Sequence, residues 1–184
     1  MIKKVCSFFG HRTINVTNML IEKIRNLIED LIVNQNVLIF LFGSRSEFDS
    51  LCHGIVTELK EKYKDIERYC YTCRHESCTL ESEREYWEGV YSRFHKREVH
   101  LLGVEKEVEH KTKYTSGRAS YVERNQAMID ASDICIFYYD ELYQPEMRKY
   151  SKRSIYYQPK SGTKIAYDYA KMKKKVIYNV YDKL

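Results

Sequence analysis

Short apolar runs alternate with amphipathic stretches along this chain, and the alternation predicts its fold class. Continuous apolar runs are typical of strands buried on both faces, whereas apolar residues at every third or fourth position are typical of helices. Strands are predicted at residues 4–9, 37–42, 66–72, 134–139 and 176–181, of which 37–42 is continuously apolar. Because helical stretches separate these runs, we predict an open α/β sheet, mostly parallel, with helices on both of its faces.

Four helices are predicted between these strands. Asn15 or Thr17 is expected to cap the first of them, because a side-chain oxygen can accept a hydrogen bond from the free N–H groups of the first turn. The apolar stripes of the four helices run through residues 21–31, 48–59, 121–130 and 165–170.

Two segments fit this pattern poorly. Residues 74–113 are dominated by charge and are interpreted as an insertion, with a short strand expected at residues 99–102. Residues 140–160 are rich in tyrosine and lysine, and a loop of this length is interpreted as a flap or a binding loop. Since no linker rich in Gly, Pro or Ser separates two halves, residues 1–184 are expected to form a single domain.

Composition and charge narrow the class of protein. No apolar run approaches the ~20 residues that cross a bilayer, and the N-terminus lacks a cleavable signal pattern. We therefore expect a cytoplasmic location and no membrane partner. The formal net charge of +5 favours anionic ligands in general and does not single out nucleic acid.

The chain has six cysteines, which are expected to be reduced in the absence of a signal pattern. Cys70, Cys73 and Cys78, with His75 among them, resemble half of a zinc site, but no second cysteine pair follows. We interpret them as ordinary thiols and predict no metal site.

Glycines and polar residues gather after the predicted strands and at the start of the last helix. In an open parallel sheet the carboxyl ends of the strands lie at one edge, where ligands bind. We therefore predict a binding site at this edge, which the residues after Tyr139 also reach. Its candidate ligand-binding residues are Gly10, His11, Arg12, Gly43, Ser44, Ser161, Gly162 and Thr163.

Phosphate suits such an edge. Residues 161–163 open a helix whose first N–H groups can bind an anion, and Gly162 allows close approach. Arg12 could hold phosphate through two hydrogen bonds, and His11 could donate a hydrogen bond or transfer a proton. The alternative is that Ser161 is an ordinary helix cap.

A second group of polar residues lies on the helix predicted at 121–130. It contains Glu123, Arg124, Asn125 and Asp130. Glu123 and Arg124 could be partners in a surface ion pair, or Arg124 could point its guanidinium toward the binding edge. The spacing alone leaves both arrangements open.

Four motifs together resemble those of YpsA-like proteins in the SLOG superfamily: FFGHR (8–12), GSRSEFD (43–49), ERNQAMIDASD (123–133) and SGTKIAYDYA (161–170). The similarity extends over nearly the whole chain and is weakest at residues 74–113. It implies a Rossmann-like fold that binds a nucleotide or a nucleotide-derived ligand at the same edge. Asp49, Arg124 and Asn125 lie within these motifs and join the candidate ligand-binding residues.

Some proteins of that superfamily, the LOG proteins, are phosphoribohydrolases. Their motif carries a glutamate three residues after the threonine of the GT turn, where this chain has Ala166. A carboxylate is needed to stabilise positive charge on the sugar or to activate water. Glu123 and Asp49 are the candidate catalytic carboxylates if the chain is an enzyme of this kind.

Three functions follow from these observations. The first is binding or sensing of a nucleotide or an ADP-ribose- or NAD-derived ligand, without a further cofactor. The second is an N-glycosidase acting on a nucleoside 5′-monophosphate. The third is DprA-like binding of single-stranded DNA through the basic, tyrosine-rich loop at residues 148–160. By analogy with the superfamily, a homodimer is also expected.

Overall fold

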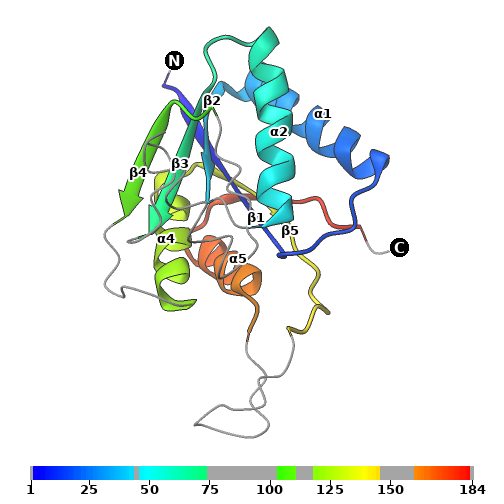
Figure 1. The fold of residues 1–184 in the computed structure, drawn as a ribbon, viewed down its shortest axis with the longest axis vertical. Coiled ribbons are helices and arrows are strands. Elements are labelled where there is room, and N and C mark those ends of the chain that lie inside the picture. Colours follow the sequence, from blue (N-terminus) through cyan, green and yellow to red (C-terminus); the bar gives the residue numbers. More distant parts are fainter. Residues whose placement is uncertain (1, 44–45, 74–102, 111–117, 146–159, 183–184) are drawn as a thin grey trace, which may run out of the picture.

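A computed structural model describes residues 2–43, 46–73, 103–110, 118–145 and 160–182 of the chain. Its centre is a six-stranded sheet in the order β4-β3-β2-β1-β5-β6, in which every neighbouring pair is parallel (Figure 1). This confirms the predicted parallel sheet. The strands are β1 (Lys4–Gly10), β2 (Val37–Phe42), β3 (Glu67–Cys73), β4 (Lys106–His110), β5 (Ile134–Tyr138) and β6 (Val176–Asn179).

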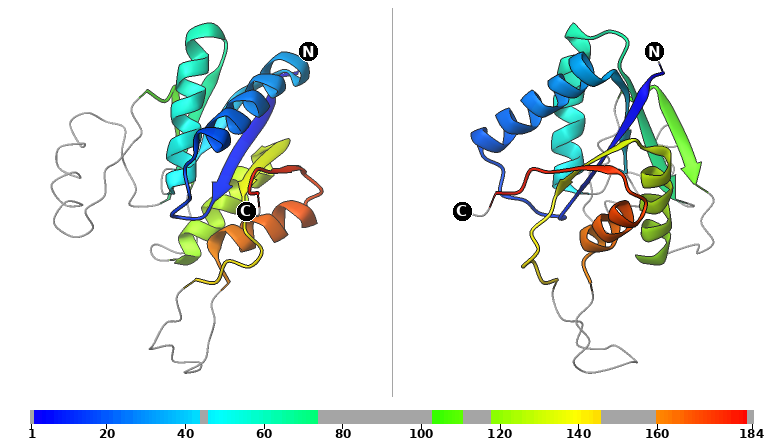
Figure 2. Two further views of the ribbon diagram at one scale, coloured as in Figure 1. Left: turned by 90° about the vertical axis from the view of Figure 1, so that its right-hand side faces the viewer. Right: turned by 180° about the vertical axis from the view of Figure 1, so that it is seen from behind.

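Helices cover both faces of the sheet, as predicted. Figure 2 shows α1 (Asn18–Gln35) and α2 (Glu47–Lys62) on one side, and α4 (Arg118–Ala131) and α5 (Gly162–Met172) on the other. Of the two proposed caps for α1, Thr17 is used, and its hydroxyl accepts the Leu20 N–H at 3.2 Å.

The core consists of two apolar layers, one on each face of the sheet. Successive side chains of a strand point to opposite faces, so Phe8 packs toward α1 and α2 while Phe9 packs toward α4 and α5. Phe40 and Leu41 of β2 divide between the two layers in the same way. The continuous apolar runs of β1 and β2 are therefore explained by burial on both faces.

β4 was not predicted, and its composition explains why. Its sequence KEVEH has one apolar residue, Val108, among charged and polar ones, because the strand lies at the edge of the sheet and is partly exposed. The predicted strand at 99–102 and most of the predicted insertion at 74–113 lie outside the described residues.

An ion pair between buried Arg68 and partly exposed Glu105 attaches the start of β4 to the rest of the sheet. Arg68, 6% exposed, donates to both carboxylate oxygens of Glu105, at 2.7 Å from Nη2 and 3.2 Å from Nε. The Arg68 backbone N–H adds a bond of 2.6 Å to the same carboxylate, and Nη1 donates to Thr57 of α2 at 2.8 Å. Gly103, with φ +88°, packs against the guanidinium. Such a glycine is favoured because this backbone conformation is costly for other residues.

The sequence predicts no membrane-spanning segment, and this prediction can be compared with the described helices alone. Among the described helices, none is both long enough and apolar enough to cross a bilayer.

Candidate functional site

The order of the strands places a switch point beside β1. From β1 the chain builds outward through β2, β3 and β4 on one side, and β5 and β6 extend the sheet on the other. The chain leaves β1 toward α1 and leaves β5 toward α5, which lie on opposite faces (Figures 1 and 2). Ligands of open α/β sheets bind where such connections diverge, beyond the carboxyl ends of the strands.

His11 follows β1 and lies at this switch point, where it is 4% exposed. Its Nε2 atom accepts the backbone N–H of Asp140 at 3.1 Å, and the ring of Tyr143 covers it with the centroids 4.0 Å apart. Burial lowers the pKa of His11, and the nearby Asp140 carboxylate opposes this shift only in part. We therefore assign a neutral imidazole, with Nε2 as acceptor and the proton on Nδ1.

The turn after β5 is fixed by its own hydrogen bonds. The Asp140 carboxylate accepts the Leu142 N–H at 2.9 Å, and its carbonyl accepts the Tyr143 N–H at 3.2 Å. A hydrogen bond to the same carboxylate is the main cause that raises the pKa of Tyr181. Asp140 therefore holds Tyr143 in place over His11. We refer to His11, Tyr139, Asp140 and Tyr143 as the His11 cluster.

The first turn of α5 adjoins this cluster. The Ser161 hydroxyl accepts the Lys164 N–H at 3.0 Å, which confirms it as the helix cap. Thr163 is buried, whereas Gly162 is exposed. Lys164 places its Nζ atom 3.3 Å from the Tyr139 hydroxyl. Since the Tyr139 ring lies 6.1 Å from that of His11, the start of α5 and the end of β1 belong to one neighbourhood.

Gly43, at the end of β2, lies against a buried arginine. A Cβ atom on Gly43 would lie 3.0 Å from Nη2 of Arg124, so this residue must be small for the guanidinium to lie where it does. The Gly43 N–H donates to Asp49 Oδ1 at 3.3 Å. Arg124 is 5% exposed, and its guanidinium lies 5.4 Å from the ring of Tyr121. Of the two arrangements left open by the sequence, Arg124 therefore adopts the one directed at the strand ends.

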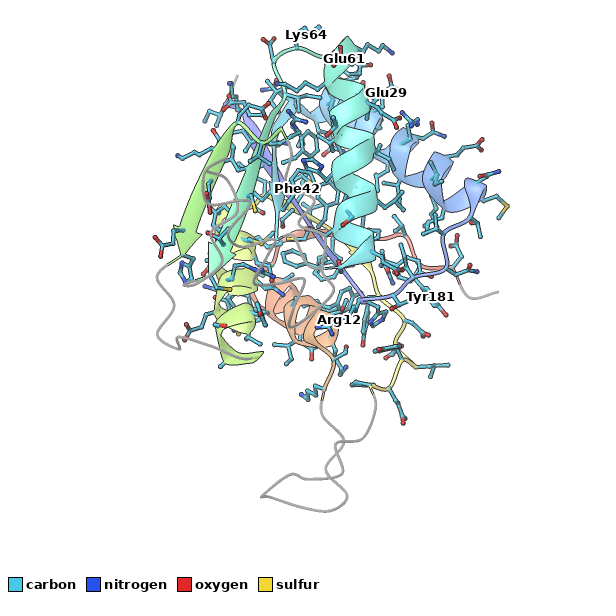
Figure 3. All side chains as sticks on the ribbon, in the orientation of Figure 1. Arg12, Glu29, Phe42, Glu61, Lys64 and Tyr181 are labelled. Carbon is cyan, nitrogen blue, oxygen red and sulfur yellow. The ribbon has the colours of Figure 1, made fainter. Side chains whose placement is uncertain are left out.

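The loop after β1 is attached to the start of α2. A Cβ atom on Gly10 would lie 2.4 Å from Cβ of Phe48, so glycine permits the close contact between strand and helix. The Arg12 carbonyl accepts the Glu47 N–H at 3.0 Å, and the Arg12 side chain is exposed. Figure 3 shows Arg12 at the end of the molecule where α5 begins, with Glu61 and Lys64 at the opposite end.

Other candidates are placed less closely. Ser44 lies outside the described residues. Asn125 is half-buried, and its Oδ1 accepts Arg124 Nη2 at 3.3 Å. Glu123 is half-buried on α4. Asp130 lies near the far end of α4, where it binds Lys173 at 2.9 Å and contributes to the contact between α4 and α5.

Two observations bear on hydrolysis and on metal binding. Ala166, at the position where the LOG motif has its glutamate, is buried in the core. Asp168 is exposed, with Oδ2 3.9 Å from Lys164 Nζ. Cys70 and Cys73 are buried thiols, and Cys78 lies outside the described part of the chain. Within that part there is no group of three or more metal-ligating side chains.

Several residues of the site were not predicted individually. The sequence pointed to the segment after Tyr139 but not to Asp140 or Tyr143, and Lys164 was not singled out. Aspartate directly after a buried strand was the available signal, because its side chain can bond to backbone N–H groups two residues on.

The fold has a known counterpart. The structure of DNA processing protein A from Helicobacter pylori, reported for its single-stranded DNA binding mode, is similar with a TM-score of 0.58 and 13% sequence identity, over 99% of this chain and 67% of that one. At this identity the similarity establishes the Rossmann-like fold alone. No protein-family model matches the sequence, and no curated protein matches it either. The resemblance to YpsA-like proteins stays a prediction.

Proposed function

We propose that the carboxyl edge of the sheet binds a nucleotide or a nucleotide-derived ligand such as an ADP-ribose. The chain shares its fold with a protein studied for its binding of single-stranded DNA. The observation that carries the proposal is the common placement of Arg12, Arg124 and the start of α5 at the end of the sheet where β1, β2 and β5 stop. This end combines positive side chains with helix N–H donors.

The phosphate is assigned to the first turn of α5. The first N–H groups of a helix have no partner within it, and the helix dipole adds positive potential at this end. Gly162 is exposed and has no heavy atom within 4 Å of where its Cβ would be, apart from its own neighbours. A phosphate can therefore approach the backbone closely. Lys164 and the exposed Arg12 supply charge around the same end.

The buried Arg124 is assigned a positioning role at the end of β2. It is covered by Gly43 on one side and lies near Tyr121 on the other. A guanidinium fixed in this way is preorganised, so little side-chain entropy is lost when it acts on a ligand. Asp49, which accepts the Gly43 N–H, fixes the backbone at the same strand end.

The experiment is calorimetric titration of the full chain with AMP, ADP-ribose and NAD. We expect saturable binding of at least one of them, weakened about ten-fold by Arg12→Gln, because charge-assisted hydrogen bonds contribute about 1.5–3 kcal/mol each. Lys64→Gln is the matched control, since it removes one exposed charge at the opposite end of the molecule (Figure 3). Absence of binding by every phosphorylated nucleoside, with the protein folded, would refute the proposal.

A second candidate is binding of single-stranded DNA. It is favoured by a row of alternating basic and aromatic side chains beside α5. On α5, the half-buried Tyr167 lies between Lys164 and Lys171 in the sequence, and Lys171 Nζ is 4.5 Å from the Tyr167 ring. The Tyr139 ring, 5.9 Å from Lys164 Nζ and 4.6 Å from the Tyr167 ring, is buried and leaves Tyr167 as the ring that a base could reach. A partly exposed ring between two lysines suits contact with a single strand. Most of the basic loop first considered for this role lies outside the described residues.

Oligonucleotide binding at two salt concentrations distinguishes this candidate. If a thymidine 20-mer follows the row of side chains, Lys171→Gln lowers the slope of log affinity against log salt by about one unit. Lys64→Gln again serves as the control and leaves the slope unchanged. Equal slopes in all three proteins would argue against DNA binding along α5.

Hydrolysis of the ligand is the third candidate, and Asp49 is the carboxylate that favours it. Asp49 is 5% exposed and lies at the same strand end as Arg124. Release of free base from AMP by the wild-type protein, lost in Asp49→Asn, would assign Asp49 as the catalytic carboxylate. Intact AMP after prolonged incubation would leave binding as the function.

A further inference from the structure

We propose that the outer face of Tyr143 is a stacking platform for the base of the ligand; the inference rests on the proposed function and specifies the ligand as one with an aromatic base. Tyr143 is 44% exposed, although it is among the large apolar side chains of the described chain. Its inner face is occupied, since the His11 ring lies 4.0 Å away at an angle of 33°. Within the described part of the chain, the exposed area of the ring is assigned to the face turned away from His11.

Contacts with the His11 ring and with the backbone of Asp140 hold Tyr143 in position. His11 beneath it is buried and accepts the Asp140 N–H, so that the lower ring does not turn freely. The Tyr143 N–H is bonded to the Asp140 carbonyl at 3.2 Å. A rigid aromatic side chain loses little conformational freedom when a ligand stacks on it, which is the condition for an effective contact.

The position of the platform agrees with the phosphate assignment. Tyr143 lies over His11, the His11 ring neighbours Tyr139, and the Tyr139 hydroxyl lies 3.3 Å from Lys164 in the first turn of α5. A nucleotide whose phosphate lies at α5 would thus have aromatic surface beside it. Because the Tyr143 ring covers His11, the base is placed outside the ring and not against the imidazole.

Stacking tolerates any base, because every base has a π face. The platform therefore predicts recognition of the base as a flat ring, without discrimination between purines by hydrogen bonds from Tyr143. A tyrosine hydroxyl contributes nothing to this contact, so phenylalanine should replace tyrosine without loss.

The test compares AMP with ribose 5-phosphate, which lacks the base, in wild-type protein and in Tyr143→Ala and Tyr143→Phe. We expect Tyr143→Ala to weaken AMP at least about five-fold, as the loss of one base–aromatic contact predicts, and to change ribose 5-phosphate less than about two-fold. Tyr143→Phe should bind both ligands as the wild type does. Leu142→Ala, which removes an exposed apolar neighbour, is the control and leaves AMP binding unchanged.

A measurement on the wild-type protein covers the case in which the alanine variant is unstable. Stacking on Tyr143 shifts the adenine H2 and H8 resonances of bound AMP upfield, through the ring current. Binding of both ligands with equal affinity, or AMP binding without these shifts, would overturn the platform and leave the proposed function standing. Failure of both ligands and of the nucleotide panel to bind would overturn the proposed function and the platform with it.

Discussion

Gly43 shows how one missing side chain determines where a charge lies. The guanidinium of Arg124 occupies the space that a Cβ atom would need, with Nη2 at 3.0 Å and Cζ at 3.1 Å. Arg124 is buried, so the arginine cannot simply swing into solvent. The residue after β2 thus controls the position of an arginine that comes from α4, some eighty residues later in the chain.

We predict that Gly43→Ala destabilises the protein by about 1 kcal/mol, because overpacking of a fixed site forces its neighbours to shift. Ligand affinity should fall as well, since Arg124 must move. Gly54→Ala is the matched control: Gly54 lies in α2 with open space around it, and alanine there should stabilise by about 0.5–1 kcal/mol. Urea unfolding of both variants measures the effects; equal stability of the two would contradict the account.

His11 makes the folded protein sensitive to acid. Burial lowers the pKa of His11 in the folded state. Below about pH 6.5, the His11 side chain therefore binds more protons in the unfolded chain than in the folded chain. The contribution of His11 to stability is therefore complete above that pH and declines as the pH falls toward the lowered value.

We predict that wild-type protein loses more free energy of unfolding between pH 7 and pH 5 than His11→Gln does. Glutamine can accept the Asp140 N–H but does not titrate, so other acid-sensitive groups cancel in the comparison. Chemical denaturation at the two pH values gives both differences. A variant that loses as much as the wild type would show that His11 does not titrate as described.

At the scale of elements, an ion pair just before β4 adds to the backbone pairing of β4 with β3. Burial alone would raise the pKa of Glu105, but hydrogen bonds from Arg68 and the charges of Arg68 and Lys60 lower it to about 2. The carboxylate therefore stays ionised to low pH and holds the start of β4 to β3 and α2. Its contribution to stability is present above about pH 4.5 and is lost as the pH falls toward 2.

We predict that Glu105→Gln destabilises the protein by about 2 kcal/mol, because it leaves the buried charge of Arg68 without its carboxylate partner. The control is Glu61→Gln, which breaks an exposed pair with Lys64 and should cost at most about 0.5 kcal/mol (Figure 3). Thermal or urea unfolding compares them. Similar losses in the two variants would contradict the assigned role of the Arg68–Glu105 pair.

The elements differ in how well the sequence predicts them. β2 was predicted with its exact bounds, because a strand buried on both faces leaves an uninterrupted apolar run. β4 was missed, because a partly exposed edge strand needs no such run and pairs with β3, which is far away in the chain. The α5 start was predicted correctly, since a Ser cap acts locally, over three residues.

At the scale of the whole molecule, the parallel sheet predicts which segments meet, but not which side chains do. The strand ends had to share one edge once the βαβ order was known. That Arg124 would lie against Gly43, or that Tyr143 would cover His11, depends on packing between elements, and no local pattern encodes it. The candidate site was therefore predictable as a place, and its interior contacts were not.

The central claim, that the first turn of α5 holds the phosphate through its backbone, has a direct test in two variants of one residue. Proline fits the first helical position, and Ser161 already has the extended backbone (φ −64°, ψ 151°) that a following proline requires. Gly162→Pro should therefore keep the helix and remove one N–H donor, whereas Gly162→Ala keeps the donor and adds a Cβ atom alone.

Calorimetric titration of the two variants with AMP, alongside the wild type, is the decisive measurement. We predict that Gly162→Pro binds AMP about ten-fold or more weakly, as the loss of one hydrogen bond to a charged group implies, while Gly162→Ala binds as the wild type does. Equal affinity in the proline and alanine variants would contradict it.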